Sequence, residues 1–172
     1  MAFMLTGLAS VTIPNSVTFI GDHAFTHCTS LTNVTILNSV TFISDHAFSN
    51  CTSLTNVTIP NSVTTIGEQA FYGCTSLTSI IIPNNVTSIG EYAFSGTGLA
   101  SVIIPNNVTS IGEQAFGWTP LTSVTFNGTG ISFNNDSFPG NNLFDLYTGT
   151  NGGPGIYTRV DNDPNTYWTK QP

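Results

Sequence analysis

Two Asp-His pairs, Asp22-His23 and Asp45-His46, carry the side chains in this sequence that are best suited to hold a metal ion. They stand 23 residues apart, and side by side they would offer two imidazoles and two carboxylates to a transition metal. The corresponding positions further along the chain hold Gln69, Tyr92 and Gln114, which indicates a tolerant, exposed position. Adjacent residues on a helical turn also diverge by about 100°. The sequence therefore predicts no metal site here.

Three cysteines, Cys28, Cys51 and Cys74, recur at the same interval of 23 residues. Later in the chain the equivalent position holds Thr97 and Thr119, so a small, semi-polar side chain suits it. An odd number of cysteines argues against a closed set of disulfides, and three thiols without further ligands make a poor zinc site. We predict buried free thiols. No Ser-His-Asp arrangement is recognisable, so we expect neither a cofactor nor enzymatic activity.

These spacings come from an internal repeat of 22 to 23 residues. Its unit is Leu-Thr-x-Val-Thr-Ile-Pro-Asn-x-Val-Thr-x-Ile-Gly-x-x-Ala-Phe-x-x-Cys-Thr-Ser, and below we number its positions from the first Leu. Copies start at Leu8, Leu31, Leu54, Leu77 and Leu99, with a partial copy from Leu121. A fixed period of this length predicts a solenoid, in which each coil buries its apolar side chains against the next.

The pattern within the unit predicts the elements of one coil. Apolar residues at positions 1, 4 and 6 are typical of the short parallel strand of a leucine-rich repeat, and proline at position 7 ends that strand. Positions 10 and 13 predict a second buried segment. An acid at position 15, just before Ala-Phe, suits the first turn of a short helix or 3₁₀ segment. The fold class expected is an α/β repeat solenoid with about 5.5 coils.

The repeats divide the chain into two parts. Residues 1–126 are expected to form the solenoid, which starts within a repeat because residues 2–8 match residues 93–99 in spacing. That start suggests either a piece of a longer protein or an open end that meets a partner. From residue 127 the period fails, and glycines alternate with large aromatic residues up to residue 172. We predict that 127–172 is a C-terminal capping segment that shields the last coil from water.

Charge excludes two classes of partner. The chain has a net charge of −7, only 6% of its residues are charged, and its two basic residues, Arg159 and Lys170, follow the repeats. Nucleic-acid binding needs a stripe of lysine or arginine to displace counterions. Membrane insertion needs an apolar run of about 20 residues, and the sequence has none. We therefore expect neither nucleic-acid binding nor membrane insertion.

The recurring Ile-Pro-Asn-x-Val-Thr-x-Ile-Gly-x-x-Ala-Phe pattern resembles the BspA-like leucine-rich repeats of bacterial and protist cell-surface proteins. The resemblance covers residues 2 to about 126, and all five full copies carry it. The tail, Gly155-Ile-Tyr-Thr-Arg159 followed by Trp168-Thr-Lys170, is similar to the ends of other such proteins. The resemblance implies an extracellular or cell-surface scaffold without enzymatic activity, which binds proteins or host surfaces. The family has no fixed binding motif that could be transferred to this chain.

Two sets of residues are candidates for binding. Phe19 and Phe42 occupy position 12, where later copies have small polar residues, and they either form an exposed apolar patch or fold back into the coil. The outward positions 3 and 5 of the first strand form the usual ligand face of a leucine-rich repeat. On this face we select Asn33, Thr35, Asn56 and Thr58. The face is polar except where Ile81 and Ile103 replace threonine, and it lacks the Trp, Tyr and Arg typical of tight protein interfaces.

The repeat also generates several Asn-x-Ser/Thr sequences. These are glycosylation acceptors only if the protein passes through a eukaryotic secretory pathway, and each is a weak signal in a chain so rich in Asn and Thr. They occur at Asn33, Asn50, Asn56, Asn85, Asn107, Asn127 and Asn135.

A second functional hypothesis is a structural subunit that stacks end to end into an extracellular filament of copies of itself. An open first coil would expose unpaired strand edges, and the surface has little charge to oppose association. A heterologous contact of that kind builds open filaments. The predicted C-terminal cap opposes simple stacking unless it docks onto the next chain.

Overall fold

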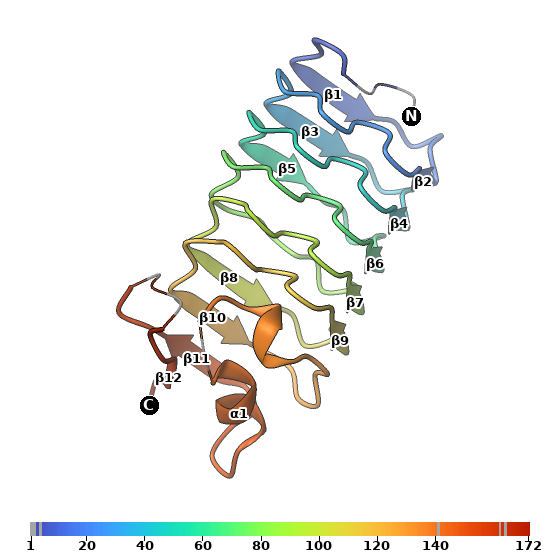
Figure 1. Ribbon diagram of the computed structural model, residues 1–172. Coiled ribbons are helices and arrows are strands. Elements are labelled where there is room, and N and C mark those ends of the chain that lie inside the picture. Colours follow the sequence, from blue (N-terminus) through green and yellow to red (C-terminus); the bar gives the residue numbers. More distant parts are fainter. Residues whose placement is uncertain (1–2, 4, 141, 162, 164) are drawn as a thin grey trace.

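The computed structural model describes residue 3 and residues 5–140, 142–161, 163 and 165–172. Ala2 and Met4, from the expected partial repeat at the start, lie outside the described residues. The chain winds into a ramp of stacked coils, with its start at one end and a helix and two further strands at the other (Figure 1). The repeat period therefore translates directly into a solenoid, as the sequence predicts.

Positions 3 to 6 of the coils form the first parallel sheet. Its register pairs equivalent residues, such as Val11 with Val34 and Val34 with Val57. The sheet is interrupted at the fourth coil, where residues 78–82 form no strand, and it resumes in the fifth and sixth coils. The strands are β1 (Ser10–Ile13), β3 (Asn33–Ile36), β5 (Asn56–Thr58), β8 (Ser101–Ile104) and β10 (Ser123–Phe126).

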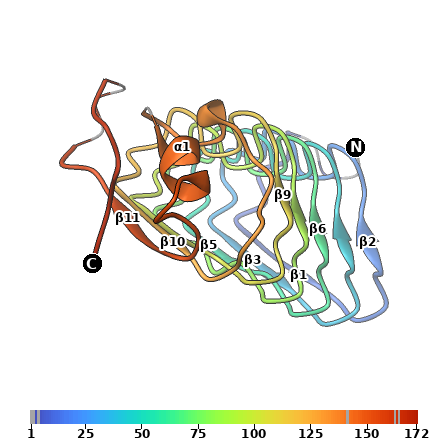
Figure 2. The same ribbon diagram turned by 90° about the horizontal axis from the view of Figure 1, so that it is seen from below.

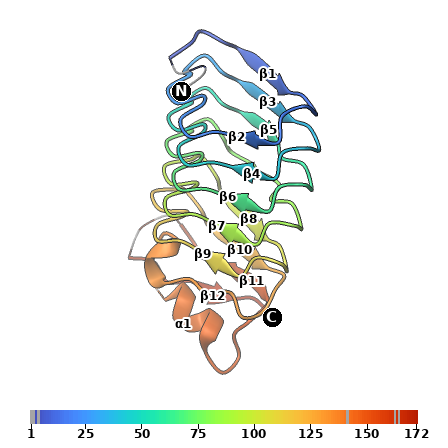
Figure 3. The ribbon, with the colours of Figure 1, turned by 90° about the vertical axis from the view of Figure 1, so that its right-hand side faces the viewer.

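Positions 12 and 13 form a second parallel sheet on another side of the coil, which faces the viewer in Figure 3. Each strand has two residues because proline or leucine at position 7 and the turn after position 13 bound a short extended segment. Seen from below, in Figure 2, the two sheets lie apart across the interior of the coil. The strands are β2 (Phe19–Ile20), β4 (Phe42–Ile43), β6 (Thr65–Ile66), β7 (Ser88–Ile89) and β9 (Ser110–Ile111).

A column of phenylalanines at position 18 forms the centre of the core. From Phe25 to Phe138 consecutive rings lie 4.9–5.4 Å apart and nearly parallel, and each ring is almost fully buried. Leucine at position 1, valine at positions 4 and 10, and isoleucine at position 13 pack around them. Each coil therefore buries the same side chains against its neighbours, which is why the unit has to repeat.

The segment around Ala-Phe differs from the expected helical turn: it is a run of hydrogen-bonded turns. Positions 16 and 20 have positive φ in every coil, for example 54° at His23 and 59° at His27. Amides at alternate positions donate to the next coil, as in Phe25 N to Ala47 O at 2.8 Å. In a helix these amides would bond within their own segment. Stacking between coils therefore replaces the helix, and the only α-helix among the described residues lies in the terminal segment.

The coil geometry continues beyond residue 126. Ser132 pairs with Ser110, the Phe116 amide donates to Ser137 O at 2.9 Å, and Phe138 stacks on Phe116. A 3₁₀ helix, η1 (Asn135–Ser137), lies where the earlier coils have their turns, and Asn134 caps it. A sixth turn of the solenoid thus closes at Phe138, although its sequence no longer follows the repeat.

The remaining residues cover the last coil. Helix α1 (Leu143–Thr148) buries Leu143 and Tyr147, and β11 (Gly155–Thr158) and β12 (Thr169–Lys170) extend the first sheet with antiparallel pairing. The change of direction matters because an antiparallel strand ends the stacking of parallel coils. Among the described residues, no helix combines the length and the hydropathy needed to span a bilayer.

Candidate functional site

Phe19 and Phe42 lie side by side on the second sheet. They are register partners in β2 and β4, and their side chains are 62% and 37% exposed. Position 12 points outward, since the isoleucine that follows it in each strand is buried. The structure thus places both rings at the surface and not inside the coil. Phe19 also lines a shallow hollow of about 220 Å³ together with Phe3, Ile13 and Val17.

Further along the same sheet the phenylalanines give way to small polar residues. Thr65, Ser88 and Ser110 continue position 12 and are half-buried, and the Ser110 hydroxyl donates to the Ser88 hydroxyl at 3.0 Å. This sheet is therefore apolar at its N-terminal end and polar beyond it.

The four other candidates lie on the first sheet. Asn33 and Asn56 are exposed register partners, as are Thr35 and Thr58 one step along, with Thr35 half-buried. The Asn33 side-chain amide donates to the Thr32 hydroxyl at 3.2 Å. Because the two sheets lie on different sides of the coil, the structure does not bring these residues together with Phe19 and Phe42 (Figure 3).

The first sheet also has an apolar region at the interrupted fourth coil. Ile81 is 83% exposed and Ile103 is 58% exposed, and both line a hollow of about 190 Å³ with Ile80, Pro105 and Asn127. A sequence signal for this region exists, because isoleucine replaces threonine at the outward position 5 in these two copies.

A second aromatic pair, Tyr92 and Trp118, was not selected as a site from the sequence. The rings lie 6.2 Å apart at 20°, and Trp118 is 68% exposed. Trp118 has φ of +50° at position 20, where the two preceding coils have Gly96 and Gly73. A large residue at a position suited to glycine was the signal that could have revealed it.

The histidines stack and do not converge. The rings of His23 and His46 lie 4.4 Å apart and 10° from parallel. Lone pairs on ring nitrogens lie in the ring plane, so parallel stacked rings direct them side by side and not toward one ion. No group of three or more potential metal ligands occurs among the described side chains.

The cysteines are buried and fill a backbone hydrogen-bonding role. The thiol of Cys51 donates to Phe25 O at 3.1 Å and that of Cys74 to Phe48 O at 3.2 Å. Thr97 and Thr119 hydroxyls donate to the carbonyl of the phenylalanine three residues before them at the same position of the unit. Burial raises the pKa of Cys51 to about 12, with the neighbouring Cys28 adding to the shift. These thiols are therefore poor nucleophiles.

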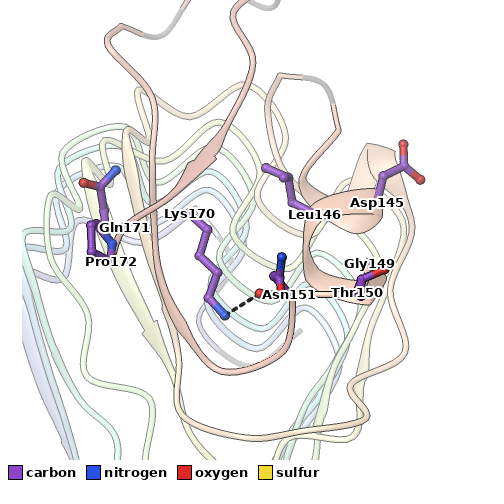
Figure 4. Close-up of a pocket in the computed structure, with 8 residues that line it drawn as sticks. All are labelled: Asp145, Leu146, Gly149, Thr150, Asn151, Lys170, Gln171 and Pro172. Atoms are coloured by element: carbon purple, nitrogen blue, oxygen red, sulfur yellow. Dashed lines mark hydrogen bonds between the residues drawn. The ribbon is translucent and has the colours of Figure 1, made fainter.

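The largest hollow described, about 460 Å³, lies in the terminal segment beside α1 (Figure 4). Lys170 Nζ donates to Asn151 O at 2.9 Å and Gly152 O at 3.0 Å, and it lies 5.8 Å from the centre of the Tyr157 ring. Asp145 is the only carboxylate side chain that lines it. The lysine thus fastens the loop before β11 to β12, which makes this hollow a structural feature of the C-terminal segment.

The Asn-x-Ser/Thr sites differ in their surroundings. Asn50 is half-buried, and the side-chain amides of Asn85 and Asn107 donate to Asn61 O and Asn84 O of the preceding coil, both at 2.7 Å. The others are exposed: Asn33, Asn56, Asn127 and Asn135, besides Asn85 and Asn107 themselves.

Solved structures with this architecture are bacterial. The chain is 39% identical to a leucine-rich repeat protein from Bacteroides ovatus (TM-score 0.58; 62% of this chain, 30% of that one). It is 34% identical to the T. pallidum leucine-rich repeat protein (TM-score 0.63; 66% and 56%). A leucine-rich cell-surface protein from Faecalibacterium prausnitzii is 30% identical (TM-score 0.55; 95% and 45%). The chain thus spans between 30% and 56% of the length of these proteins. No curated protein matches it.

The repeat signature itself is specific. The family described as "BspA type Leucine rich repeat region (6 copies)" matches residues 1–119 and 88–151, well over half of the chain. Its matched residues include the stacked coils, the phenylalanine column and the turns with positive φ. The chain therefore belongs to the BspA-type leucine-rich repeat family.

Proposed function

We propose that this chain is a non-enzymatic, extracellular or cell-surface scaffold that binds another protein or a host surface. The family and the cell-surface protein from Faecalibacterium prausnitzii support this proposal. So does the architecture, in which the residues of the core and the backbone of each coil are used for stacking. What remains for binding is the outward side chains, which vary from coil to coil while the core does not.

The observation that carries the proposal is the exposed pair Phe19 and Phe42. Nothing in the packing of the coil requires phenylalanine at position 12, since threonine and serine occupy it in β6, β7 and β9. Aromatic side chains bury about 150–250 Å² each and dominate interface energetics. Two adjacent rings on a rigid sheet therefore offer an anchor for a partner, at little entropic cost because the strands already hold them.

The candidates on the first sheet support a second, weaker contact. Asn33, Thr35, Asn56 and Thr58 present hydrogen-bonding groups in two columns, and Ile81 and Ile103 add apolar area further along. Polar surroundings around a small apolar centre are typical of non-obligate interfaces. We assign these residues to specificity more than to affinity.

Bead adhesion tests the proposal. Beads coated with the full chain are expected to adhere to a host-cell monolayer more than uncoated beads do. Replacing both Phe19→Ser and Phe42→Ser, as in later coils, should lower adhesion by about tenfold, because truncating an interface anchor costs at least about 1 kcal/mol per residue.

The matched control changes the same column where it is already polar. Thr65→Ser and Ser88→Ala alter position 12 of the third and fourth coils without removing an aromatic ring, and adhesion should stay unchanged. Circular dichroism establishes that all variants are folded. Adhesion by the Phe19/Phe42 double variant equal to that of the original chain would contradict the proposal.

The second candidate is the end-to-end filament. Its support is the apolar hollow around Phe19, Ile13 and Val17 at the first coil, and the scarcity of charge on the repeats. Against it, α1, β11 and β12 cover the last coil and break the parallel stacking (Figure 1). A filament would need this terminal segment to fit the first coil of the next copy. We therefore rank the single-chain scaffold above it.

A further inference from the structure

One carboxylate per coil forms a column along the turns of the solenoid. Its members are exposed, and backbone bonds hold neighbouring coils in register at this point, with Gln69 N donating to Glu91 O at 2.8 Å and Tyr92 N to Glu113 O at 2.9 Å. At the spacing of adjacent strands, successive carboxylates begin about 4.8 Å apart. The column consists of Asp22, Asp45, Glu68, Glu91 and Glu113.

No lysine or arginine neutralises this column. The chain has two such residues, and both are engaged in the C-terminal segment. Lys170 bonds to Asn151 O and Gly152 O. Arg159 is buried, donates to Leu121 O and Asp163 O, and lies 5.4 Å from the centre of the Trp168 ring. Like charges stacked in this way repel one another, so a cationic partner would relieve a cost that the folded chain itself leaves in place.

At one end the acidic column meets the exposed aromatic pair. The Tyr92 ring stacks against Trp118, and the Tyr92 phenol lies among carboxylates. Burial raises the pKa of Tyr92, and the charges of Glu113, Glu91, Asp136 and Glu68 raise it further. We call Glu68, Glu91, Tyr92, Glu113 and Trp118 the aromatic–acidic surface.

Trp118 is at this surface in spite of its backbone. A φ of +50° is unfavourable for a bulky residue, and the coils before it use glycine at the same position. With 68% of its side chain exposed, Trp118 gains little packing in return. A strained, exposed tryptophan beside unneutralised carboxylates indicates that its use lies in binding.

We propose that the aromatic–acidic surface binds a lysine- or arginine-rich segment of a partner protein. An ammonium or guanidinium group over the Trp118 or Tyr92 ring gains a cation–π interaction, and the carboxylates accept charge-assisted hydrogen bonds from the same side chains. An apolar partner would bury the carboxylates unpaired, which is costly. This surface lies on the turns, apart from Phe19 and Phe42 on the second sheet, so the inference goes beyond the proposed adhesive anchor and can fail or hold separately from it.

Calorimetric titration of the full chain with a lysine octapeptide tests the inference. We expect saturable binding that weakens with added salt, because screening shortens the range of exposed charges. Fluorescence gives a second readout: Trp118 is exposed and Trp168 is 1% exposed, so the peptide should alter the emission of Trp118. Trp118→Ala should weaken binding about threefold to fivefold, the effect of an exposed cation–π contact.

Charge variants separate a localised site from general attraction. Glu91→Gln with Glu113→Gln should weaken binding by about fivefold, whereas Asp22→Asn with Asp45→Asn, in the same column but distant from the rings, should change it less than about twofold. Both double variants remove two charges, so they are matched. Equal losses in the two double variants, equal binding of a glutamate octapeptide, or an unaltered affinity in Trp118→Ala would overturn the inference.

Discussion

Position 20 of the coil shows how one residue can serve different purposes on the same backbone. The chain is left-handed there in every coil, with glycine in the third and fourth coils and His27, Asn50 and Trp118 in the others. Glycine reaches this region freely and asparagine tolerates it, but tryptophan does so at a cost. The fold therefore requires the conformation and leaves the side chain free to vary.

Replacing Trp118→Gly should for this reason stabilise the chain. Removing the strain of a left-handed tryptophan is expected to raise the free energy of unfolding by about 1 kcal/mol, reduced by the loss of its contact with Tyr92. Urea unfolding followed by circular dichroism measures the change. Gly96→Trp, the reverse change one coil earlier, should destabilise. If Trp118→Gly lowers stability, the ring packs more than its exposure indicates.

At the scale of the element, the coil is held by contacts with its neighbours more than by its own hydrogen bonds. Amides of the turns donate to the next coil, and threonine at position 11 donates twice to the same carbonyl of the preceding coil, as Thr64 N and Thr64 Oγ1 both do to Thr41 O. The position of the strands followed from apolar spacing and proline. The conformation of the Ala-Phe segment did not, because propensity and dipole arguments describe an isolated segment, whereas pairing between coils decides it here.

The phenylalanine column gives this element its most sensitive position. Phe71 is fully buried between Phe48 and Phe94, 5.3 and 5.4 Å from their ring centres. Phe71→Ala should lower the free energy of unfolding by about 3–5 kcal/mol, the usual range for deleting a buried ring. Tyr72→Ala, next to it and half-buried, should cost far less. A loss below about 1 kcal/mol in Phe71→Ala would mean that the column can close over the gap.

For the whole molecule, the sequence predicted the architecture far better than the site. Exact periodicity made the stacking of Phe25, Cys51 and their equivalents foreseeable. Trp118 was not foreseen, since it occurs once and no repeat emphasises it. Whether Phe19 and Phe42 point out or in also depended on which residues of a two-residue strand face solvent, and only coordinates show that.

The solenoid as a single chain with lateral binding surfaces is the central claim at this scale. Both proposed surfaces, Phe19 with Phe42 and the aromatic–acidic surface, lie along the sides of the stack and not at its ends. Neither requires a second copy of the chain, and the antiparallel strands β11 and β12 oppose end-to-end stacking.

Light scattering across a dilution series, with electron microscopy of the same sample, tests that claim most directly. The scaffold predicts the mass of one chain at every concentration and only compact particles in the micrographs. A mass that rises with concentration, together with long particles that repeat at about one chain length, would contradict it and make assembly the function.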